Sequence, residues 1–245
     1  MLKKIEEIFD GKIWNLAFGE KVVVLEIRDE LKRQVFFSAI NLTTNTFFWK
    51  DLQPEKSWWL SLVGVFGDFV FLHKYSNQSK PEALGLLVLD VKTGTLVHRF
   101  DDWIYFNTEE DKLILYRLDK DNLPIYKEVE LVLPKPEIEE NNLINHYTET
   151  SEYFPLIFKF LYHLLKIEAE KAVDYLEVND KIVISYYIYK ENQFHNYLLI
   201  TNKEKEILLH DFINSSEGIG INTFSTKSDT LFYVKNQNQL IGYEI

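Results

Sequence analysis

The stretch Gly85–Phe100, GLLVLDVKTGTLVHRF, is an apolar run, a KTG turn and a second apolar run. Short β-branched and aliphatic runs joined by a tight turn predict a β-hairpin. Related segments occur at Ile40–Phe48, INLTTNTFF, and at Ile200–Leu208, ITNKEKEIL. In the first two segments, Gly94 and Asn45 stand where such a turn requires a positive φ. Lys205 stands at this position in the third segment, which is therefore a weaker match. The hairpin is therefore a repeated unit.

A second motif recurs along the chain and precedes this hairpin. It is an acidic residue in a turn, followed by four or five mostly apolar positions, as in GDFVFLHKY and NDKIVISYY. The acidic residues are Glu20, Asp68, Asp111, Asp180 and Asp229, at steps of 48, 43, 69 and 49 residues. A period of roughly 40 to 50 residues with short strands is typical of β-propeller blades, which bury their faces only against neighbouring blades.

One repeat contains four predicted strands. The inner strand is Trp59–Phe66, the second is Phe69–Tyr75, the third is Ala83–Val91 and the outer strand is Thr95–Phe100. Five such repeats fit the chain, with LAF and VDYLEV among the other inner strands. The sequence therefore predicts an all-β, five-bladed β-propeller that forms a single domain over residues 1–245.

Both ends of the chain are predicted to lie in the same blade. LIGYEI at the C-terminus has the pattern of a third strand, Lys4–Phe9 supplies the outer strand, and Ile13–Phe18 begins the first blade. The ring is then closed by N- and C-terminal strands in one blade. KKIEEIF has helical composition, so a short N-terminal helix is the alternative.

The step of 69 residues from Asp111 to Asp180 is longer than the others. The extra length predicts one inserted α-helix, within about residues 151–172. Apolar residues recur at helical spacing between Glu152 and Ala172, and Pro155 suits only the first turn of a helix. These apolar residues are Ile157, Phe160, Leu161, Leu164, Leu165 and Ala169. Phe158 and Tyr162 lie on other faces, which predicts burial against the propeller or against a second subunit. The preceding LPKPEIEENN is a predicted polar loop.

Composition narrows the classes of partner. The formal net charge of −11 and the lack of a basic cluster argue against nucleic acid. The most apolar window, Tyr153–Leu165, is shorter than the ~20 residues needed to span a bilayer, and acidic residues interrupt any N-terminal export signal. We expect a cytoplasmic protein with no membrane partner, monomeric, or dimeric through the inserted helix.

The residues LLVLDVKTGTLVHRF, with INLTTNTFFWKDL before them, resemble the quinoprotein-type repeat of bacterial β-propellers. The chain also resembles an uncharacterised bacterial family of about this length through its SWW and LEIRDE segments. The resemblance implies the fold only. Some quinone-dependent propellers stack the cofactor on a vicinal disulfide, and this chain has no cysteine. We expect no cofactor.

Two pairs of residues are candidates for ligand binding. Trp58 and Trp59 begin an inner strand, where alternation turns one indole toward the next blade and the other toward the channel or top face. They are either a stacking platform for a sugar or base, or packing between blades. Glu26 and Arg28 lie on one side of a strand and form either a polar pocket or a structural ion pair.

A third candidate lies where an outer strand crosses to an inner one. Asp102 and Trp103, beside Asp101, would be near a loop end of the ring, where Asp102 either helps to bind a cation or caps the turn. Asp174 and Glu177 are acidic residues of an inner strand, and their odd spacing places them on opposite faces, which argues against a retaining glycosidase pair.

The six histidines and the acidic residues form no recognisable metal or catalytic motif. The leading functional hypothesis is a non-catalytic module that binds a protein or small ligand. The alternative is an enzyme acting on a small molecule or carbohydrate at the channel mouth, with loop carboxylates.

Overall fold

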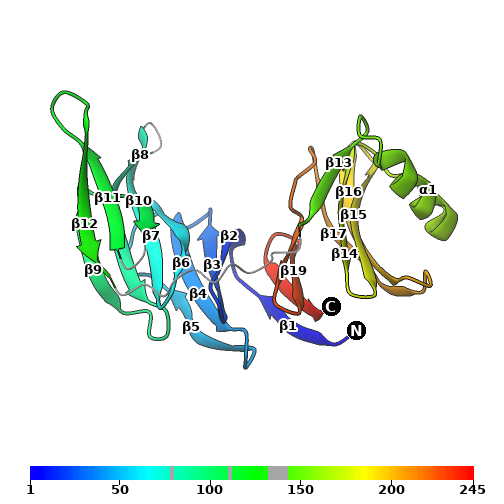
Figure 1. Cartoon of the computed structure of the whole chain (residues 1–245), viewed down its shortest axis with the longest axis horizontal. Coiled ribbons are helices and arrows are strands. Elements are labelled where there is room, and N and C mark those ends of the chain that lie inside the picture. The colour runs from blue at the N-terminus through cyan, green and yellow to red at the C-terminus, as the bar shows by residue number, and fades with distance from the viewer. Residues whose placement is uncertain (78–79, 110–111, 132–142) are drawn as a thin grey trace. The chain divides into compact units, whose positions relative to one another are not determined.

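The computed structural model describes residues 1–77, 80–109, 112–131 and 143–245 (Figure 1). The predicted acidic residue at Asp111 and the predicted polar loop at 133–142 lie outside these residues. The chain divides into two compact units, one formed by Asp10–Ile138 and the other by Met1–Phe9 with Glu139–Ile245. They are called the middle unit and the terminal unit below. The prediction of a single domain stays a prediction.

The middle unit contains three antiparallel sheets in chain order. The first has the order β2 (Lys12–Phe18), β3 (Val22–Asp29), β4 (Gln34–Asn41), β5 (Thr46–Leu52). The second has the order β6 (Leu60–Phe66), β7 (Phe69–Asn77), β8 (Lys80–Asp90), β9 (Leu96–Asp101). The third has three described strands, β10 (Ile104–Glu109), β11 (Lys112–Leu118), β12 (Pro124–Glu130). The strands predicted for the opening repeat are confirmed, with shifts only at their ends.

The terminal unit contains two antiparallel sheets and a helix. One sheet has the order β13 (Asn145–Thr148), β14 (Ala172–Val178), β15 (Lys181–Lys190), β16 (Gln193–Asn202), β17 (Ile207–Ser216). The other has the order β18 (Phe224–Lys227), β19 (Thr230–Lys235), β20 (Gln239–Glu244), β1 (Lys3–Ile8). The helix is α1 (Phe154–Leu165).

The N-terminal strand β1 pairs antiparallel with the C-terminal strand β20, so the two ends of the chain share one sheet (Figure 1). Ile5 of β1 is buried, whereas Ile8 is exposed. Together with the five antiparallel sheets and the one helix found among the described residues, this pairing confirms the predicted all-β fold class of five blades, one helix and both terminal strands in one blade. The alternative of an N-terminal helix is wrong, because pairing with β20 and burial of one face outweigh helical composition.

An equivalent backbone hydrogen bond forms where the acidic motif recurs. The amide that follows one strand donates to the carbonyl oxygen of a residue in the turn before the preceding strand. Val91 N donates to Asp68 O at 2.8 Å, and Ile245 N donates to Asp229 O at 2.8 Å. The same bond joins Lys203 N to Asp180 O at 3.1 Å and Leu42 N to Lys21 O at 3.0 Å. In the first sheet, Lys21 rather than the predicted Glu20 is therefore the equivalent residue.

The repeated hairpin turns also have equivalent conformations. Asn45 has φ of 56° and Gly94 has φ of 70°, as predicted. Lys205 has φ of 69°, so the weaker third match adopts the same turn in spite of its side chain. Asp90 Oδ1 accepts hydrogen bonds from Lys92 N and Thr93 N, which stabilises the turn locally.

Apolar faces of successive sheets pack against one another within each unit. In the middle unit, Val24 of β3 packs with Leu62 of β6 and Leu72 of β7, and Phe71 packs with Leu115 of β11. In the terminal unit, Leu198 of β16 packs with Leu231 of β19. Face-to-face packing of this kind is how blades are stabilised, because a single small sheet cannot bury its own faces.

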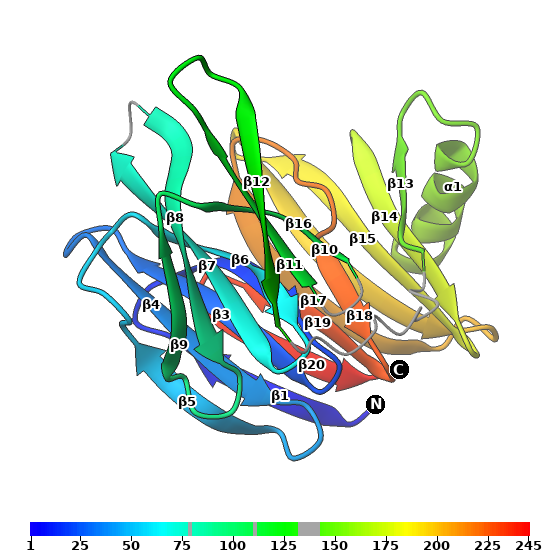
Figure 2. The same cartoon turned by 60° about the vertical axis from the view of Figure 1, so that its left-hand side comes forward.

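The helix α1 packs on the other face of the β13–β17 sheet (Figure 2). Phe154, Ile157 and Leu161 are its buried residues, and they contact a cluster that includes Ile184 and Tyr186. Of the two predicted alternatives, the structure shows the helix packed on a sheet of its own chain, and Pro155 lies in the first turn as predicted. Among the described residues, no helix has the length and apolar character needed to cross a membrane.

Two details of this insertion differ from the prediction. The helix ends at Leu165, because Lys166 adopts a left-handed conformation with φ of 59° and closes the last turn. Ala169 is buried, but it lies beyond the helix. The sheet also has a fifth strand, β13, which pairs with β14, so the predicted inner strand VDYLEV is the second strand of its sheet.

Candidate functional site

The candidate site is built on β3 of the middle unit, where an apolar face becomes polar. Val22, Val24 and Glu26 alternate along this strand and are all buried, and Arg28 continues the row. Alternation along a strand places these four side chains on one face, the face that packs against the β6–β9 sheet. A carboxylate therefore occupies a position in a row of core residues.

Both oxygens of the Glu26 carboxylate are engaged, and the side chain has 0% exposure. Oε1 accepts from Arg28 Nε at 2.6 Å, while Oε2 accepts from Leu62 N at 2.7 Å and from Ser61 Oγ at 3.1 Å. A buried charge is tolerated only when it is paired and hydrogen-bonded in this way. The contacts join β3 of one sheet to β6 of the next.

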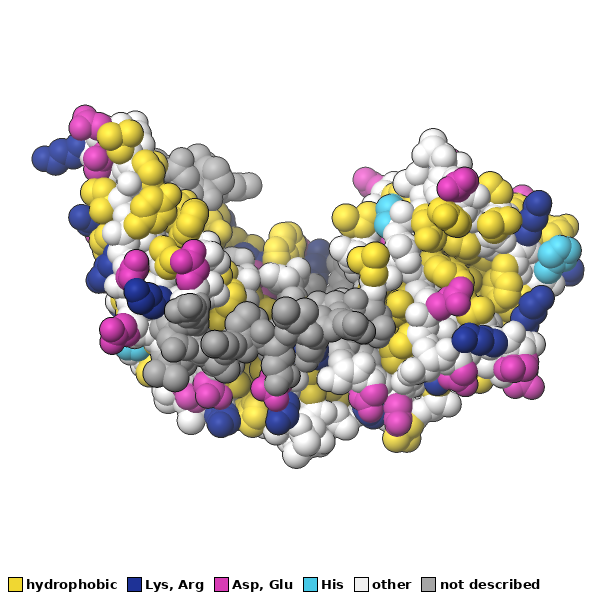
Figure 3. Space-filling view, viewed as in Figure 1, with side chains coloured by type: hydrophobic (Ala, Val, Ile, Leu, Met, Phe, Trp, Pro, Cys, Tyr) yellow, Lys and Arg dark blue, Asp and Glu magenta, His cyan; other side chains and the backbone are white. Residues whose placement is uncertain are grey.

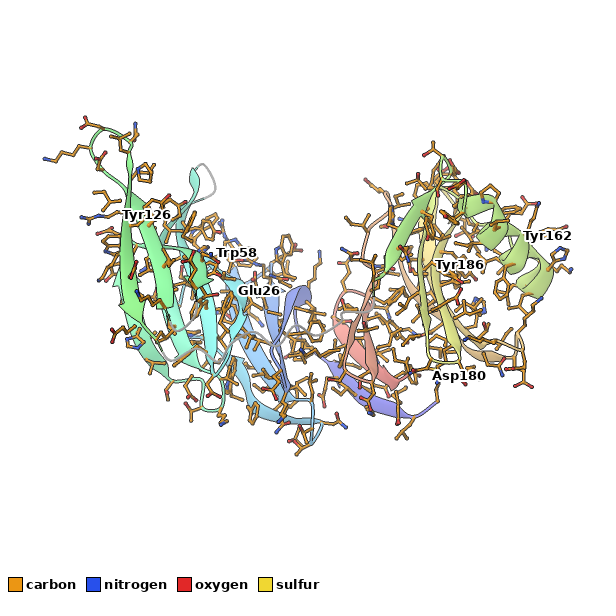
Figure 4. The ribbon with its side chains drawn as sticks, viewed as in Figure 1. Glu26, Trp58, Tyr126, Tyr162, Asp180 and Tyr186 are labelled. Carbon is orange, nitrogen blue, oxygen red and sulfur yellow. The ribbon has the colours of Figure 1, made fainter. Side chains whose placement is uncertain are left out.

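Arg28 extends the same connection toward the start of β6. Its guanidinium donates to Trp58 O at 3.1 Å and to Leu60 O at 2.8 Å. It also lies close to two indole rings, 4.8 Å from the ring centroid of Trp58 and 5.5 Å from that of Trp14. Figure 4 shows Glu26 and Trp58 in the same part of the middle unit. The predicted residues Glu26, Arg28 and Trp58 are thus brought together.

Trp14 was not among the predicted site residues, although it has the most exposed indole of this group. It is 62% exposed and lies on β2 at a register shift between Ile13 and Asn15 in the pairing with β3. A β-bulge of this kind redirects a side chain. No local sequence signal marks the bulge, and so the exposure of Trp14 depends on strand pairing.

Trp59 follows Trp58, and its backbone is hydrogen-bonded to the backbone of β7. Trp59 N donates to Ser57 Oγ, and Trp59 O accepts from Tyr75 N at 2.8 Å. Burial, and to a smaller degree the charge of Glu26, raise the pKa of the Tyr75 hydroxyl. The phenol is thus neutral beside the cluster.

Asp102 and Trp103 lie apart from these contacts, on the segment between β9 and β10. Asp102 is exposed with φ of 62°, and its amide donates to Leu84 O at 2.8 Å. The Trp103 ring lies 4.7 Å from the Arg117 guanidinium and 5.5 Å from Lys127 Nζ. Two cations thus flank this indole, which packs on the core between its sheet and the preceding one.

The Trp14, Glu26, Arg28 and Trp58 side chains, called the indole cluster below, are suited to binding rather than to proton transfer. Neither carboxylate oxygen of Glu26 is open to solvent, because the side chain is buried and accepts hydrogen bonds from three donors. A buried, ion-paired carboxylate is a poor general acid or base. An exposed indole, in contrast, offers a flat apolar surface with a polar N–H.

A second polar group missed by the sequence analysis lies in the terminal unit. His146 Nδ1 is 2.7 Å from Asp174 Oδ1. Asp174 lies opposite His146 in the pairing of β14 with β13, whereas Glu177 hydrogen-bonds Tyr175 on the other face. The predicted separation of Asp174 and Glu177 onto opposite faces is therefore confirmed. In the part of the chain that the structure describes, no group of three or more acidic, His or Cys side chains has metal-binding geometry.

One comparison with known protein families matches a segment that contains three of the four residues of the indole cluster, without Trp14, and assigns it no activity. No curated protein matches the chain. Residues 18–98 match a family described as a domain of unknown function, DUF4905, and this segment contains Glu26, Arg28 and Trp58.

Proposed function

We propose that the protein is a binding module and that the indole cluster, which is non-catalytic, binds a neutral sugar. The observation that carries this proposal is the 62% exposure of Trp14 beside a guanidinium that is already neutralised by Glu26. An exposed indole provides a stacking face for a pyranose ring. The paired charges of Glu26 and Arg28 favour a neutral ligand over an anion.

Rigidity of the cluster supports the same proposal. The Arg28 side chain is held by two carbonyl oxygens and one carboxylate, so the surface beside Trp14 is preorganised. Preorganised contacts reduce the entropy that is lost when a ligand binds. The alternative, an enzyme with a site at the channel mouth, would need a free acid or base, which this cluster lacks.

The proposal includes the broader assignments made from composition and pattern. The five sheets are quinoprotein-like blades. This is supported by the equivalent hairpin turns and by the equivalent backbone hydrogen bonds, such as the bond from Val91 N to Asp68 O. The protein acts as a cytoplasmic monomer without a membrane partner, and its net charge of −11 argues against a nucleic-acid partner.

The test begins with a glycan array probed by the wild-type protein. For a glycan that binds, Trp14→Ala should weaken the Kd at least roughly tenfold, which corresponds to about 1.4 kcal/mol. The melting temperature should stay nearly unchanged, because an exposed side chain is removed. Tryptophan fluorescence during the titration reports on stacking.

Trp49→Phe is the matched control. The Trp49 N–H donates to Val91 O at 2.8 Å, and the residue packs in the core between two sheets. This variant should lower stability and leave the Kd unchanged. Failure of the wild-type protein to bind any glycan on the array, or equal affinity of wild type and Trp14→Ala, would refute the proposal.

A further inference from the structure

A histidine and a carboxylate of the terminal unit form a pair that is independent of the indole cluster. His146 lies on β13, the strand at one end of its sheet, and Asp174 lies directly opposite on β14. Asp174 points to the face that packs on the β1–β20–β19–β18 sheet, because Thr223, just before β18, contacts it. The pair thus lies within a single unit.

Asp174 is 2% exposed and accepts three hydrogen bonds from two residues. Thr223 N and Thr223 Oγ1 both donate to Oδ2 at 2.8 Å, and the imidazole of His146 contacts Oδ1 at 2.7 Å. Thr223 by itself satisfies one oxygen of the carboxylate. The other oxygen is directed at the histidine, so the imidazole has a fixed orientation.

The carboxylate also determines the tautomer of His146. An ionised carboxylate can only accept, so the neutral form of the ring carries its hydrogen on Nδ1 and its lone pair on Nε2. The His146 side chain is 27% exposed. Nε2 has no hydrogen-bond partner among the residues that the structure describes. The ring thus presents a basic nitrogen whose direction is set by Asp174.

The polar surroundings of the pair are not a closed structural network. Ser185 lies opposite Asp174 on β15 and donates to Asn196 Oδ1 at 3.1 Å, with both residues about 1% exposed. The buried Asn196 Nδ2 has no partner among the described residues. A buried network with a purely structural role satisfies its members, because each unmet group costs free energy.

We propose that His146 is the proton-accepting residue of a small-molecule site and that Asp174 is its positioning residue. The ligand class is a neutral molecule with an acidic O–H or N–H. The proton passes from the ligand to Nε2, the bonding pair stays on the ligand oxygen or nitrogen, and Asp174 stabilises the resulting imidazolium. Transfer back to the ligand, or to water, restores the neutral ring.

The negative charge of Asp174 argues for a neutral rather than an anionic ligand. Its hydrogen-bond partners among the described residues are His146 and Thr223, and neither carries a fixed positive charge. Tyr187 is the neighbouring titratable group on β15, and its hydroxyl is engaged with Gly220 O and N. Burial raises the pKa of Tyr187, so it adds no charge near neutral pH.

The first test uses the wild-type protein and needs no ligand. Two-dimensional ¹⁵N NMR of the imidazole should show His146 with hydrogen on Nδ1 and an unprotonated Nε2 at pH 8. Diethyl pyrocarbonate, which acylates unprotonated imidazole nitrogen, should modify His146 faster than the more buried His73, as mapped by mass spectrometry. Hydrogen on Nε2, or a His146 that resists acylation, would overturn the proposal.

Asp174→Asn tests the role of the carboxylate. The amide of Asn can donate to Nδ1 and thereby favour the opposite tautomer, so acylation of His146 should slow by at least roughly tenfold. Thr223→Val is the matched control, because it removes one hydrogen bond to Asp174 and leaves the imidazole contact intact. Equal slowing in both variants would show that the effect is a general loss of structure. Should Asp174→Asn fail to fold, the wild-type tautomer and acylation rate decide the question.

Discussion

The guanidinium of Arg28 lies 2.6 Å from Oε1 of Glu26, two residues earlier on the same strand, and the carboxylate is fully buried. Residues two apart on a strand share a face, so this contact forms within β3 itself. The same guanidinium then reaches the backbone at Trp58 and Leu60 of the next sheet. An intrastrand ion pair thus connects two blades.

Arg28→Ala should lower the free energy of unfolding by about 3 to 5 kcal/mol, because it leaves Glu26 buried without its cation. Chemical denaturation of the purified protein measures this. Lys12→Ala is the matched control, since Lys12 pairs with Glu30 at 2.8 Å while both side chains are about half exposed. That change should cost no more than about 1 kcal/mol. Equal costs for the two variants would contradict the structural role of Arg28.

The pairing of the two chain ends makes a prediction about β1. Ile5→Ala should destabilise the protein by about 2 to 5 kcal/mol, because Ile5 is 4% exposed and truncation leaves a cavity. Ile8→Ala, in the same strand, should cost under about 1 kcal/mol, because Ile8 is 64% exposed. Thermal unfolding followed by circular dichroism compares the two variants. Similar losses at both positions would argue against the described burial of β1.

The hairpin turns predict opposite effects for two substitutions. Lys205→Gly should stabilise the protein by up to about 1 kcal/mol, because glycine adopts a positive φ without the steric cost of a Cβ. Gly94→Ala should destabilise it by about 1 to 2 kcal/mol, since the new Cβ would also lie 2.9 Å from Leu52 Cδ2. Urea denaturation midpoints measure both changes. A destabilised Lys205→Gly variant would show that the side chain contributes more than the turn geometry costs.

His73 predicts a pH dependence of stability. Burial lowers the pKa of His73 from 6.5 to about 4, and its Nε2 accepts a hydrogen bond from Tyr105 N at 3.2 Å. The unfolded chain therefore binds a proton between pH 6.5 and pH 4 that the folded protein does not. Stability is complete above pH 6.5 and falls as the pH is lowered toward 4, by up to about 3 kcal/mol from this group.

The measurement is the free energy of unfolding at pH 7.5, 5.5 and 4.5 for wild type and His73→Gln. Glutamine has an oxygen that can accept from Tyr105 N but does not titrate in this range. The variant should lose less stability than wild type as the pH falls. Parallel pH profiles for the two proteins would exclude His73 as a source of the dependence.

The blade repeat was predictable because its signals are local. The acidic turn before an apolar run, and the Asn or Gly at the hairpin, act through a few neighbouring residues, and the backbone hydrogen bond shared by the repeats forms at three of the predicted acidic residues, Asp68, Asp180 and Asp229. The helix was predicted from its spacing, but its end was not. Lys166 ends it by adopting a left-handed conformation that no helix-terminating Gly or Pro marks.

The candidate site was predictable only in part. Spacing placed Glu26 and Arg28 on one face, but their contacts with Leu62 and Trp58 depend on which sheet packs on β3. The exposure of Trp14 depends on a bulge in the pairing of β2 with β3. These features arise from strand register and sheet packing, which no local pattern encodes.

The sequence by itself determined an all-β chain of five repeats with one inserted helix and with both termini in one blade, because turn chemistry and apolar alternation act between near neighbours. Tertiary structure alone decided which distant side chains meet, as for Arg28 with Trp58 and His146 with Asp174. The physical reason is that such contacts depend on the register between strands and on the burial of one sheet against another. Both are set by the free energy of the whole fold rather than by any single segment.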